Sequence, residues 1–268
     1  MARTALTLCC LVAAVYAVAV QNERRQNGYY FKPELATSYW NDSGLPILFN
    51  FSDSQFSNTV DGDPAGSSYW TSSSITGTNG QQYLAVSHAL IFNGANNETF
   101  YRASVLPLSR PEDYSSFIVS TNESALAAGS QLKVTVDGNG FQGLTEDNVS
   151  QMRTYSNHDK VTFDITYNAT SPALVDAAVG LFTFGTGVSY EWGLPNCYTE
   201  GALLVDGSSV TIDPANSFTW YDRQWNNGIP STGNWTWFEL HIPHTGYRLS
   251  VWAVDNAQPY QRLRFATI

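Results

Sequence analysis

Apolar and polar residues alternate along most of the chain after Tyr69, and this two-residue period is typical of half-buried β-strands. The clearest run places two sets of side chains on opposite faces of one strand: Leu84, Val86, His88, Leu90 and Phe92 against Tyr83, Ala85, Ser87, Ala89 and Ile91. Similar alternation recurs at 131–136, 161–167, 218–225, 235–242 and 247–254. The pattern predicts an all-β protein built from antiparallel strands.

Turn residues divide these runs and indicate how they connect. Asp137-Gly138-Asn139-Gly140 and Asp206-Gly207 lie between apolar runs and predict tight hairpins. Ser120 and Glu123 form a capping-box pattern, which predicts a short helix that ends before Gly129. Pro195 and Asn196 interrupt the strands, so we expect two antiparallel β units, residues 20–195 with an irregular leading segment and residues 196–268.

The first 19 residues have the three parts of a signal peptide: the basic Arg3, the apolar run 5–18, and the small residues Ala17-Val18-Ala19. The apolar run is short for a bilayer span, so we expect cleavage rather than an anchor. The sequence predicts a secretory-pathway protein that is secreted and free of the membrane once residues 1–19 are removed. Cys197 is then the only cysteine left, so no intrachain disulfide can form.

Composition narrows the expected partners. The formal net charge is −10, which argues against nucleic acid because phosphate binding needs a basic face. Aromatic residues make up 14% of the chain and charged residues 13%, a balance that suits an aromatic-lined interior and an apolar small molecule. Seven N-x-S/T sequons predict a glycoprotein, at Asn41, Asn50, Asn97, Asn122, Asn148, Asn168 and Asn234.

Sequence motifs for cofactors are missing. No glycine-rich phosphate loop opens a helix, which argues against a nucleotide cofactor. Glu239, His241 and His244 have the chemistry of metal ligands but no recognised spacing. No G-x-S-x-G elbow marks a hydrolase. We therefore expect no metal and no cofactor, and the oligomeric state has no signature in the sequence.

The densest cluster of aromatic and ionisable residues is the run 218–225. On a strand, one face would carry Phe218, Trp220, Asp222 and Gln224, and the other Thr219, Tyr221, Arg223 and Trp225. An acid beside indole rings is desolvated, which raises its pKa and makes it a proton donor near neutral pH. The alternative is a buried Asp222 that is paired with a donor on a neighbouring strand and serves structure alone.

The run 235–242 repeats this arrangement. Trp235, Trp237, Glu239 and His241 would share a face that either lines a ligand cavity or meets solvent. His88 lies on the apolar face of its strand, where a histidine is either a hydrogen-bonded core residue or, in a ligand-holding barrel, directed toward the ligand.

Residues 191–254 resemble the hydroxyneurosporene-synthase-like family of lipocalin-like proteins, which includes carotenoid hydratases, kievitone hydratase and fungal Diels–Alderases. The resemblance is carried by Glu191-Trp192-Gly193, Gly201, Asp206-Gly207 and the runs 220–225 and 235–240, with a weaker echo at 69–92. It implies that the second β unit is a lipocalin-like barrel with a pocket near the domain junction. Because the chain ends at Ile268 while relatives continue, it also implies a barrel that is short, completed differently or truncated.

The resemblance implies a pericyclase or a hydratase, and the strand alternation and aromatic content fit a carrier equally well. A Diels–Alderase-like pericyclase would cyclise a linear polyene, a polyketide–amino acid hybrid, using Arg223, Tyr221 or His88 as the hydrogen-bond donor. Its substrate would be enclosed by Trp70, Trp220, Trp225, Trp237, Glu239 and His241. A hydratase would instead use Asp222 to protonate an isoprenoid double bond, with His88 or His241 directing water. A secreted carrier of an apolar metabolite would need only the pocket. Hydratase-branch members often carry a histidine where this chain has Arg223, which favours the pericyclase.

Overall fold

Strands account for most of the residues described by the computed structural model, which are 48–57, 65–93, 98–123 and 125–268. The predicted all-β class is confirmed. The strands are β1 (Ala65–Thr76), β2 (Gln82–Asn93), β3 (Thr99–Pro107), β4 (Ser115–Thr121), β5 (Lys133–Val136), β6 (Asn139–Gly143), β7 (Gln151–His158), β8 (Val161–Ala169), β9 (Leu174–Val175), β10 (Leu181–Phe184), β11 (Gly187–Val205), β12 (Ser208–Thr211), β13 (Phe218–Asn226), β14 (Gly233–His241), β15 (Arg248–Ala257) and β16 (Tyr260–Thr267).

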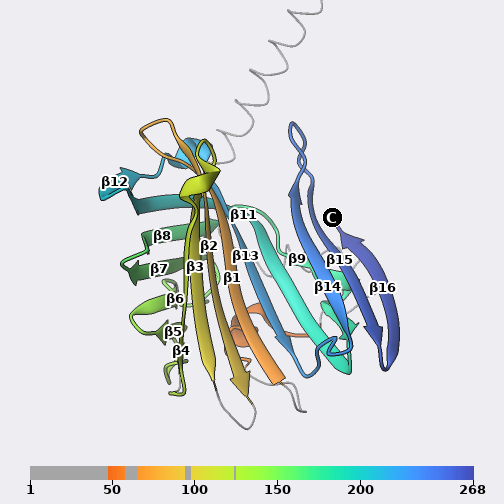
Figure 1. Ribbon diagram of the computed structural model, residues 1–268. Coiled ribbons are helices and arrows are strands. Elements are labelled where there is room, and N and C mark those ends of the chain that lie inside the picture. Colours follow the sequence, from red (N-terminus) through yellow and green to blue (C-terminus); the bar gives the residue numbers. More distant parts are fainter. Residues whose placement is uncertain (1–47, 58–64, 94–97, 124) are drawn as a thin grey trace, which may run out of the picture.

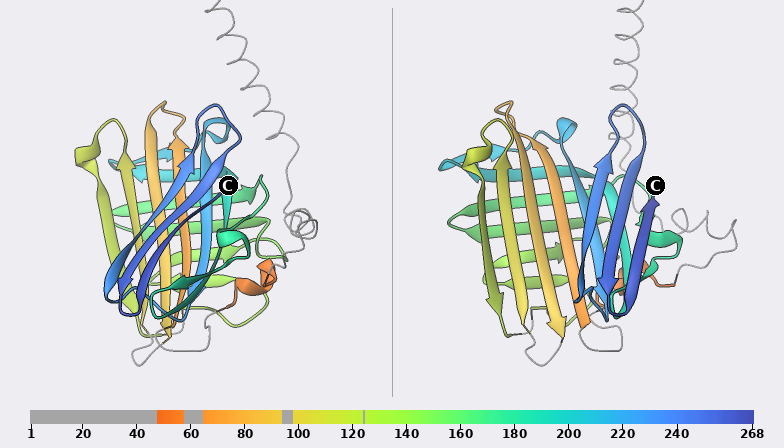
Figure 2. Two further views of the ribbon diagram at one scale, coloured as in Figure 1. Left: turned by 90° about the vertical axis from the view of Figure 1, so that its right-hand side faces the viewer. Right: turned by 45° about the vertical axis from the view of Figure 1, so that its right-hand side comes forward.

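The strands form one large antiparallel sheet and one small one. The main sheet has the order β4-β3-β2-β1-β13-β11-β8-β7-β6-β5, with β9, β10 and β12 also paired to β11. It folds over on itself, so that β1 to β4 and β13 form one layer and β5 to β8 run across behind them (Figures 1 and 2). The result is a nearly closed barrel-like sheet. The small sheet, β14-β15-β16, lies against the outside of β1 and β13 (Figure 2).

Strand β11 joins the two layers of the main sheet. Its first part pairs with β13 and its last part with β8, and the register with β13 shifts between Leu194 and Cys197. The predicted domain boundary at Pro195 and Asn196 therefore falls inside a continuous strand, and 20–195 and 196–268 are not separate units. The proline lies at a β-bulge, where a residue without an N–H is tolerated. The actual division is between the main sheet and β14 to β16.

The interior of the main sheet is filled by side chains. Tyr69 and Tyr101 of the front layer pack on Phe141 of the back layer, with ring centroids 6.1 and 6.4 Å apart. The hydroxyl of Tyr101 donates to the carbonyl of Tyr155, 3.0 Å away. This bond satisfies the buried Tyr101 hydroxyl, which would otherwise have lost its hydrogen bonds to water. This tight aromatic packing makes the barrel interior a core.

A short helix, α3 (Phe51–Ser54), packs against this core. Asn50 is its N-cap, and its side-chain oxygen accepts from the backbone N–H of Asp53. The next residue, Gln55, is fully buried: its amide nitrogen donates to the carbonyl of Asn148, while the hydroxyl of Tyr221 donates to its amide oxygen. These bonds tie the segment before β1 to the core.

The helix predicted from Ser120 and Glu123 is wrong. Ser120 lies within β4, and Leu126 makes an isolated bridge to Val134 instead of entering a helix. Strand pairing has overridden a local capping signal. Among the described residues, no helix has the length and apolarity needed to cross a bilayer. The predicted signal peptide, residues 1–19, lies outside the described residues.

Candidate active site

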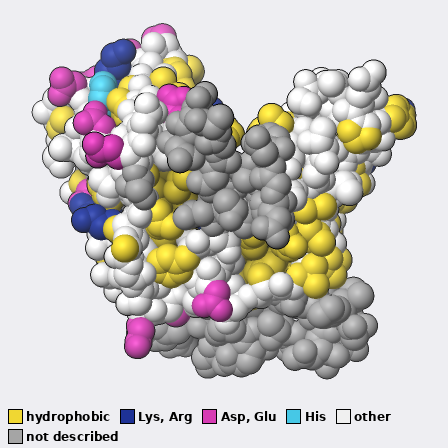
Figure 3. Space-filling model, turned by 90° about the horizontal axis from the view of Figure 1, so that it is seen from below, with side chains coloured by type: hydrophobic (Ala, Val, Ile, Leu, Met, Phe, Trp, Pro, Cys, Tyr) yellow, Lys and Arg dark blue, Asp and Glu magenta, His cyan; other side chains and the backbone are white. Residues whose placement is uncertain are grey.

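The strand faces predicted for 218–225 and 235–242 are confirmed, and they meet. One rung of the main sheet runs from His88 on β2 through Trp70 on β1 and Asp222 on β13 to Gly193 on β11. The side chains of His88, Trp70 and Asp222 point away from the barrel interior, toward the small sheet. The layer between the two sheets, called the interlayer below, therefore collects the candidate residues. Seen from below, the molecule shows two lobes with a notch between them (Figure 3).

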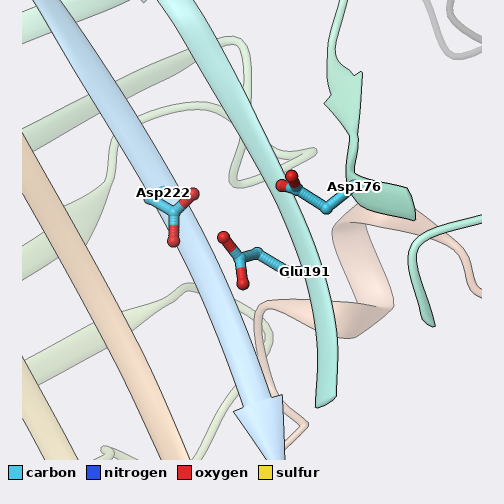
Figure 4. Close-up of side chains that lie close together, drawn as sticks. All are labelled: Asp176, Glu191 and Asp222. Atoms are coloured by element: carbon cyan, nitrogen blue, oxygen red, sulfur yellow. The ribbon is translucent and has the colours of Figure 1, made fainter. Parts of the chain in front are cut away.

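Three carboxyl groups converge at the β11 side of the interlayer. Glu191 lies two residues before Gly193 on β11, so it shares the face of Asp222. Asp176 enters from the turn after β9, which itself pairs with β11. Carboxylate oxygens of the three residues lie within 4.8 Å of one another, and the side chains point toward one another (Figure 4). Asp176 and Glu191 are fully buried and Asp222 is 6% exposed.

Burial dominates the electrostatics of this carboxyl cluster. It raises the pKa of Asp176 to about 7. Burial, followed by the nearby Asp176 and Glu239 carboxylates, raises the pKa of Asp222 well above its ordinary value. Burial, followed by Asp222 and Asp176, does the same to the pKa of Glu191. Because three charges cannot share so dry a site, at least one carboxyl group holds its proton at neutral pH.

The groups around the three carboxyls suit a cluster that shares protons better than one that binds a metal ion. Carboxylate oxygens are good ligands for hard divalent cations. The indole Nε1–H of Trp252, however, donates to Glu191 Oε1 over 3.1 Å. An N–H directed at the cluster stabilises the charged carboxylate in the place of a cation, and would be repelled by one. Protonation of one or more carboxyls reduces the repulsion among the three groups without a metal.

The small sheet contributes the opposite wall of the interlayer. Trp237 of β14 packs on Trp70, Trp220 and Trp252, with ring centroids 6.1 to 6.3 Å apart. His241 lies 4.1 Å from the ring of Phe218, measured between centroids. Glu239 accepts a hydrogen bond from Ser72 of β1. The aromatic faces thus surround the carboxyls with apolar, polarisable surface.

Many buried polar atoms of the interlayer have no hydrogen-bond partner among the described residues. These atoms are Nε1 of Trp70, Nε2 of Gln224, Oε2 of Glu239 and both ring nitrogens of His241. Native proteins pair nearly all buried polar groups, so these atoms have hydrogen-bonding capacity that the described side chains do not use. The predicted residues Trp70, Trp220, Asp222, Trp237, Glu239 and His241 thus lie together in the interlayer.

Three other predicted residues, Tyr221, Arg223 and Trp225, point the opposite way, into the core. The Arg223 guanidinium is fully buried, donates to the carbonyls of Ser57, Ser68 and Gln224, and lies 4.2 Å from the Tyr69 ring centroid. The strand alternation that directs Asp222 outward directs its two neighbours inward. The structure therefore does not bring these three predicted residues together with Asp222.

His88 lies on the interlayer face, next to Trp70, but away from the carboxyl cluster. Arg102 Nε donates to His88 Nδ1 over 3.0 Å, and Ser68 lies 2.9 Å from the other ring nitrogen. Burial, and then the Arg102 charge, lowers the pKa of His88 to about 3. The ring is thus neutral with its proton on Nε2, which makes it a poor base and a fixed support for Trp70.

The predicted glycosylation sites differ in their exposure to solvent. Asn122 and Asn234 are exposed, while Asn148 is 3% exposed and its amide is held by hydrogen bonds at both ends. Asn50 is exposed and caps α3, and Asn168 is half-buried on β8. Asn41 and Asn97 lie outside the described residues. A glycan on Asn148 would have to displace the bonds that hold the chain around residue 130.

Sequence reasoning missed Asp176 and the acidic role of Glu191. Glu191 stood in a motif that carried the family resemblance, but nothing in its spacing linked it to Asp222, which lies 31 positions later. Asp176 lies in a turn without any pattern. The available signal was an acid inside a strongly aromatic strand, where a charge is costly unless it has a use.

Sequence comparison finds relatives with known reactions. The chain is 48% identical to kievitone hydratase of Fusarium solani subsp. phaseoli over 263 residues, which cover 96% of this chain and 71% of the relative. The chain belongs to the kievitone hydratase family. A further relative, the dehydratase asqC of Emericella nidulans, is 41% identical over 246 residues, or 90% of this chain and 67% of the relative. No family model matches the chain.

Solved structures agree with this family. Kievitone hydratase from Nectria haematococca matches with a TM-score of 0.72 and 44% identity, over 82% of this chain and 64% of that chain. The chain thus spans 64 to 71% of the length of its hydratase relatives. CghA, crystallised with Sch210972, matches at 12% identity and a TM-score of 0.50, over 76% of this chain and 57% of that chain, which shows a shared fold alone. The resemblance to lipocalin-like hydratases is confirmed, whereas the narrower family name is not.

Proposed function

We propose that this protein is a hydro-lyase that adds water to, or removes it from, a carbon–carbon double bond of an apolar substrate by acid catalysis. The observation that carries the proposal is the buried carboxyl cluster of Asp176, Glu191 and Asp222 beneath a layer of indole rings. Its named relatives are a hydratase and a dehydratase, which supports the same reaction class. The substrate we propose to test first is kievitone, followed by apolar compounds that carry an isoprenoid double bond.

The chemistry requires one acid and a surface that tolerates positive charge. Neutral Asp222 gives its proton to one alkene carbon, which leaves a tertiary cation on the other carbon. The rings of Trp70, Trp220 and Trp237 stabilise that cation through their electron-rich faces. Water then bonds to the cation and loses a proton to a carboxylate, so that the net change is one added water. The reverse sequence is the dehydration.

Glu191 and Asp176 help to keep Asp222 protonated. Asp176 is close enough to raise the pKa of Asp222, and Glu191 belongs to the same carboxyl cluster, so a further charge on Asp222 is disfavoured and its proton stays in place until a better acceptor approaches. When Asp222 ionises, the charge remains within a cluster that can redistribute its protons. The apolar walls also suit an apolar substrate. They limit uncontrolled reaction of the cation with bulk water.

The test is an assay of the purified protein with each substrate in water enriched in heavy oxygen, read by mass spectrometry. A hydratase gives a product heavier by one water that carries the heavy oxygen, and Asp222→Asn abolishes it. As a matched control, Asp159→Asn removes an exposed carboxyl in the turn after β7 and leaves turnover unchanged. Conversion to an isomer of unchanged mass would refute the hydro-lyase and support the Diels–Alderase-like pericyclase. Binding without conversion would support the carrier.

The pericyclase is the weaker candidate on geometry. Its proposed donors Arg223 and Tyr221 are committed to hydrogen bonds within the core. The shared fold with CghA does not extend to these residues, because 12% identity carries no residue roles.

We also propose, from the leader and the sequons alone, that the protein enters the secretory pathway and leaves the cell as a glycoprotein. The measurement is immunoblotting of culture medium and cell extract, with and without enzymatic removal of N-glycans. Protein found only inside cells, with no shift on deglycosylation, would refute this localisation.

A further inference from the structure

Glu239 occupies a distinctive position opposite the carboxyl cluster. It is carried by β14 of the small sheet, while Asp222 is carried by β13 of the main sheet, and its charge is close enough to raise the pKa of Asp222. Its neighbours along β14, Trp237 and His241, both contact Trp220. Glu239 therefore lies beside Trp220, on the opposite wall of the interlayer from Asp222.

The two oxygens of Glu239 have different surroundings. Oε1 accepts from the hydroxyl of Ser72, the cross-strand neighbour of Trp220. Oε2 is buried and has no hydrogen-bond partner among the described residues. One oxygen is therefore anchored, while the other is available to accept a hydrogen bond within the interlayer. A carboxylate fixed in this way has the geometry of a positioned base.

We propose that Glu239 is the general base that binds the attacking water, with Ser72 as the residue that positions its carboxylate. This inference rests on the proposed hydro-lyase function. As the water oxygen bonds to the cationic carbon, one water proton passes to Glu239 Oε2 and the O–H electron pair stays on oxygen. Asp222 has supplied the other hydrogen to the neighbouring carbon, so the atoms and charges of the added water balance. Solvent exchange then resets both carboxyls.

The protonation behaviour is compatible with this role. Burial raises the pKa of Glu239 to about 7, and the Ser72 hydrogen bond opposes this rise. The ionised fraction, which is the active form of a base, therefore increases as the pH rises through about 7. The titratable and charged groups of the surrounding elements are Asp222 on β13, Glu191 on β11, Asp176 after β9, His88 on β2, His241 on β14 and Arg248 on β15.

The experiment compares Glu239→Gln with Ser72→Ala and Asp222→Asn in heavy water. Glutamine still accepts the Ser72 hydrogen bond but cannot take a proton. We expect Glu239→Gln to lower kcat for hydration by about 100-fold or more, as for loss of a general base. It should still exchange deuterium into the alkene carbon, because protonation by Asp222 and its reversal remain. Asp222→Asn should lose both hydration and deuterium exchange. Ser72→Ala should lower kcat by less than about 10-fold.

Each outcome bears on the inference. Loss of hydration with retained exchange, and loss of the rise in rate through about pH 7, supports Glu239 as the base. Equal hydration by Glu239→Gln and wild type overturns this role while leaving the hydro-lyase intact. Loss of exchange together with hydration also overturns it, because the substitution would then act on structure or on protonation. A wild type that hydrates nothing overturns the proposed function first and the role of Glu239 with it.

Discussion

Asp176→Asn should make the protein more stable while impairing the site. Asp176 is fully buried, and its pKa is raised by burial from the ordinary 3.8 to about 7. A carboxyl whose folded pKa exceeds its unfolded pKa favours folding below the unfolded value. That contribution is lost as the pH rises from 3.8 through about 7, because folding must then take up a proton.

The size of the effect follows from the two pKa values. At about 1.4 kcal/mol per pH unit, the window between 3.8 and about 7 corresponds to about 4 kcal/mol of lost stability above it. Asparagine cannot ionise, so it avoids the loss. The substitution also removes the Asp176 charge, which raises the pKa of Asp222 and of Glu191. Loss of this repulsion should further increase the stability of the variant.

Chemical denaturation across this pH window gives the measurement. The variant and the wild type should have similar free energies of unfolding at the acidic end, and the variant should be more stable by up to about 4 kcal/mol at the alkaline end. The exposed control Asp159→Asn should show no such divergence. A difference between Asp176→Asn and wild type that stays constant with pH would refute the account of Asp176 as a buried, protonated carboxyl.

Four further outcomes are expected. Gly193→Ala should lower activity more than stability, because its new Cβ would lie 3.1 Å from an indole nitrogen and 3.4 Å from a carboxyl oxygen of the site; unchanged kcat would contradict this. Arg223→Met should cost about 3 kcal/mol in a denaturation experiment, since the buried cation satisfies three carbonyls; a stable but inactive variant would instead indicate a role in chemistry. Glycopeptide mapping of the secreted protein should find glycan on Asn234 and none on Asn148. Burial raises the pKa of the Cys197 thiol, so alkylation should require unfolding, and rapid labelling of the native protein would show that the strand opens.

Few features of the sequence indicate how the strands assemble. Pro195 in β11 shows why. A proline after a strand-like run predicts a break, but a bulge absorbs the missing N–H and lets one strand serve both layers. The helix predicted near Ser120 failed for a similar reason, because β4 pairing outweighs a single capping box. Such choices depend on partners that are distant in the chain.

The local chemistry of each strand can be predicted from the sequence alone. Alternation fixed the all-β class, and it placed Asp222 with Trp220 on one face and Arg223 with Tyr221 on the other. Side-chain direction alternates along any strand, so this information is local. Which face becomes core and which faces the small sheet depends on long-range packing, so it follows from the assembled fold alone. Folding of the main sheet made the Arg223 face a packed core, and docking of β14 to β16 made the Asp222 face an interlayer. Asp176 joined the site because β9 pairs with β11, a contact between strands that no period in the sequence encodes.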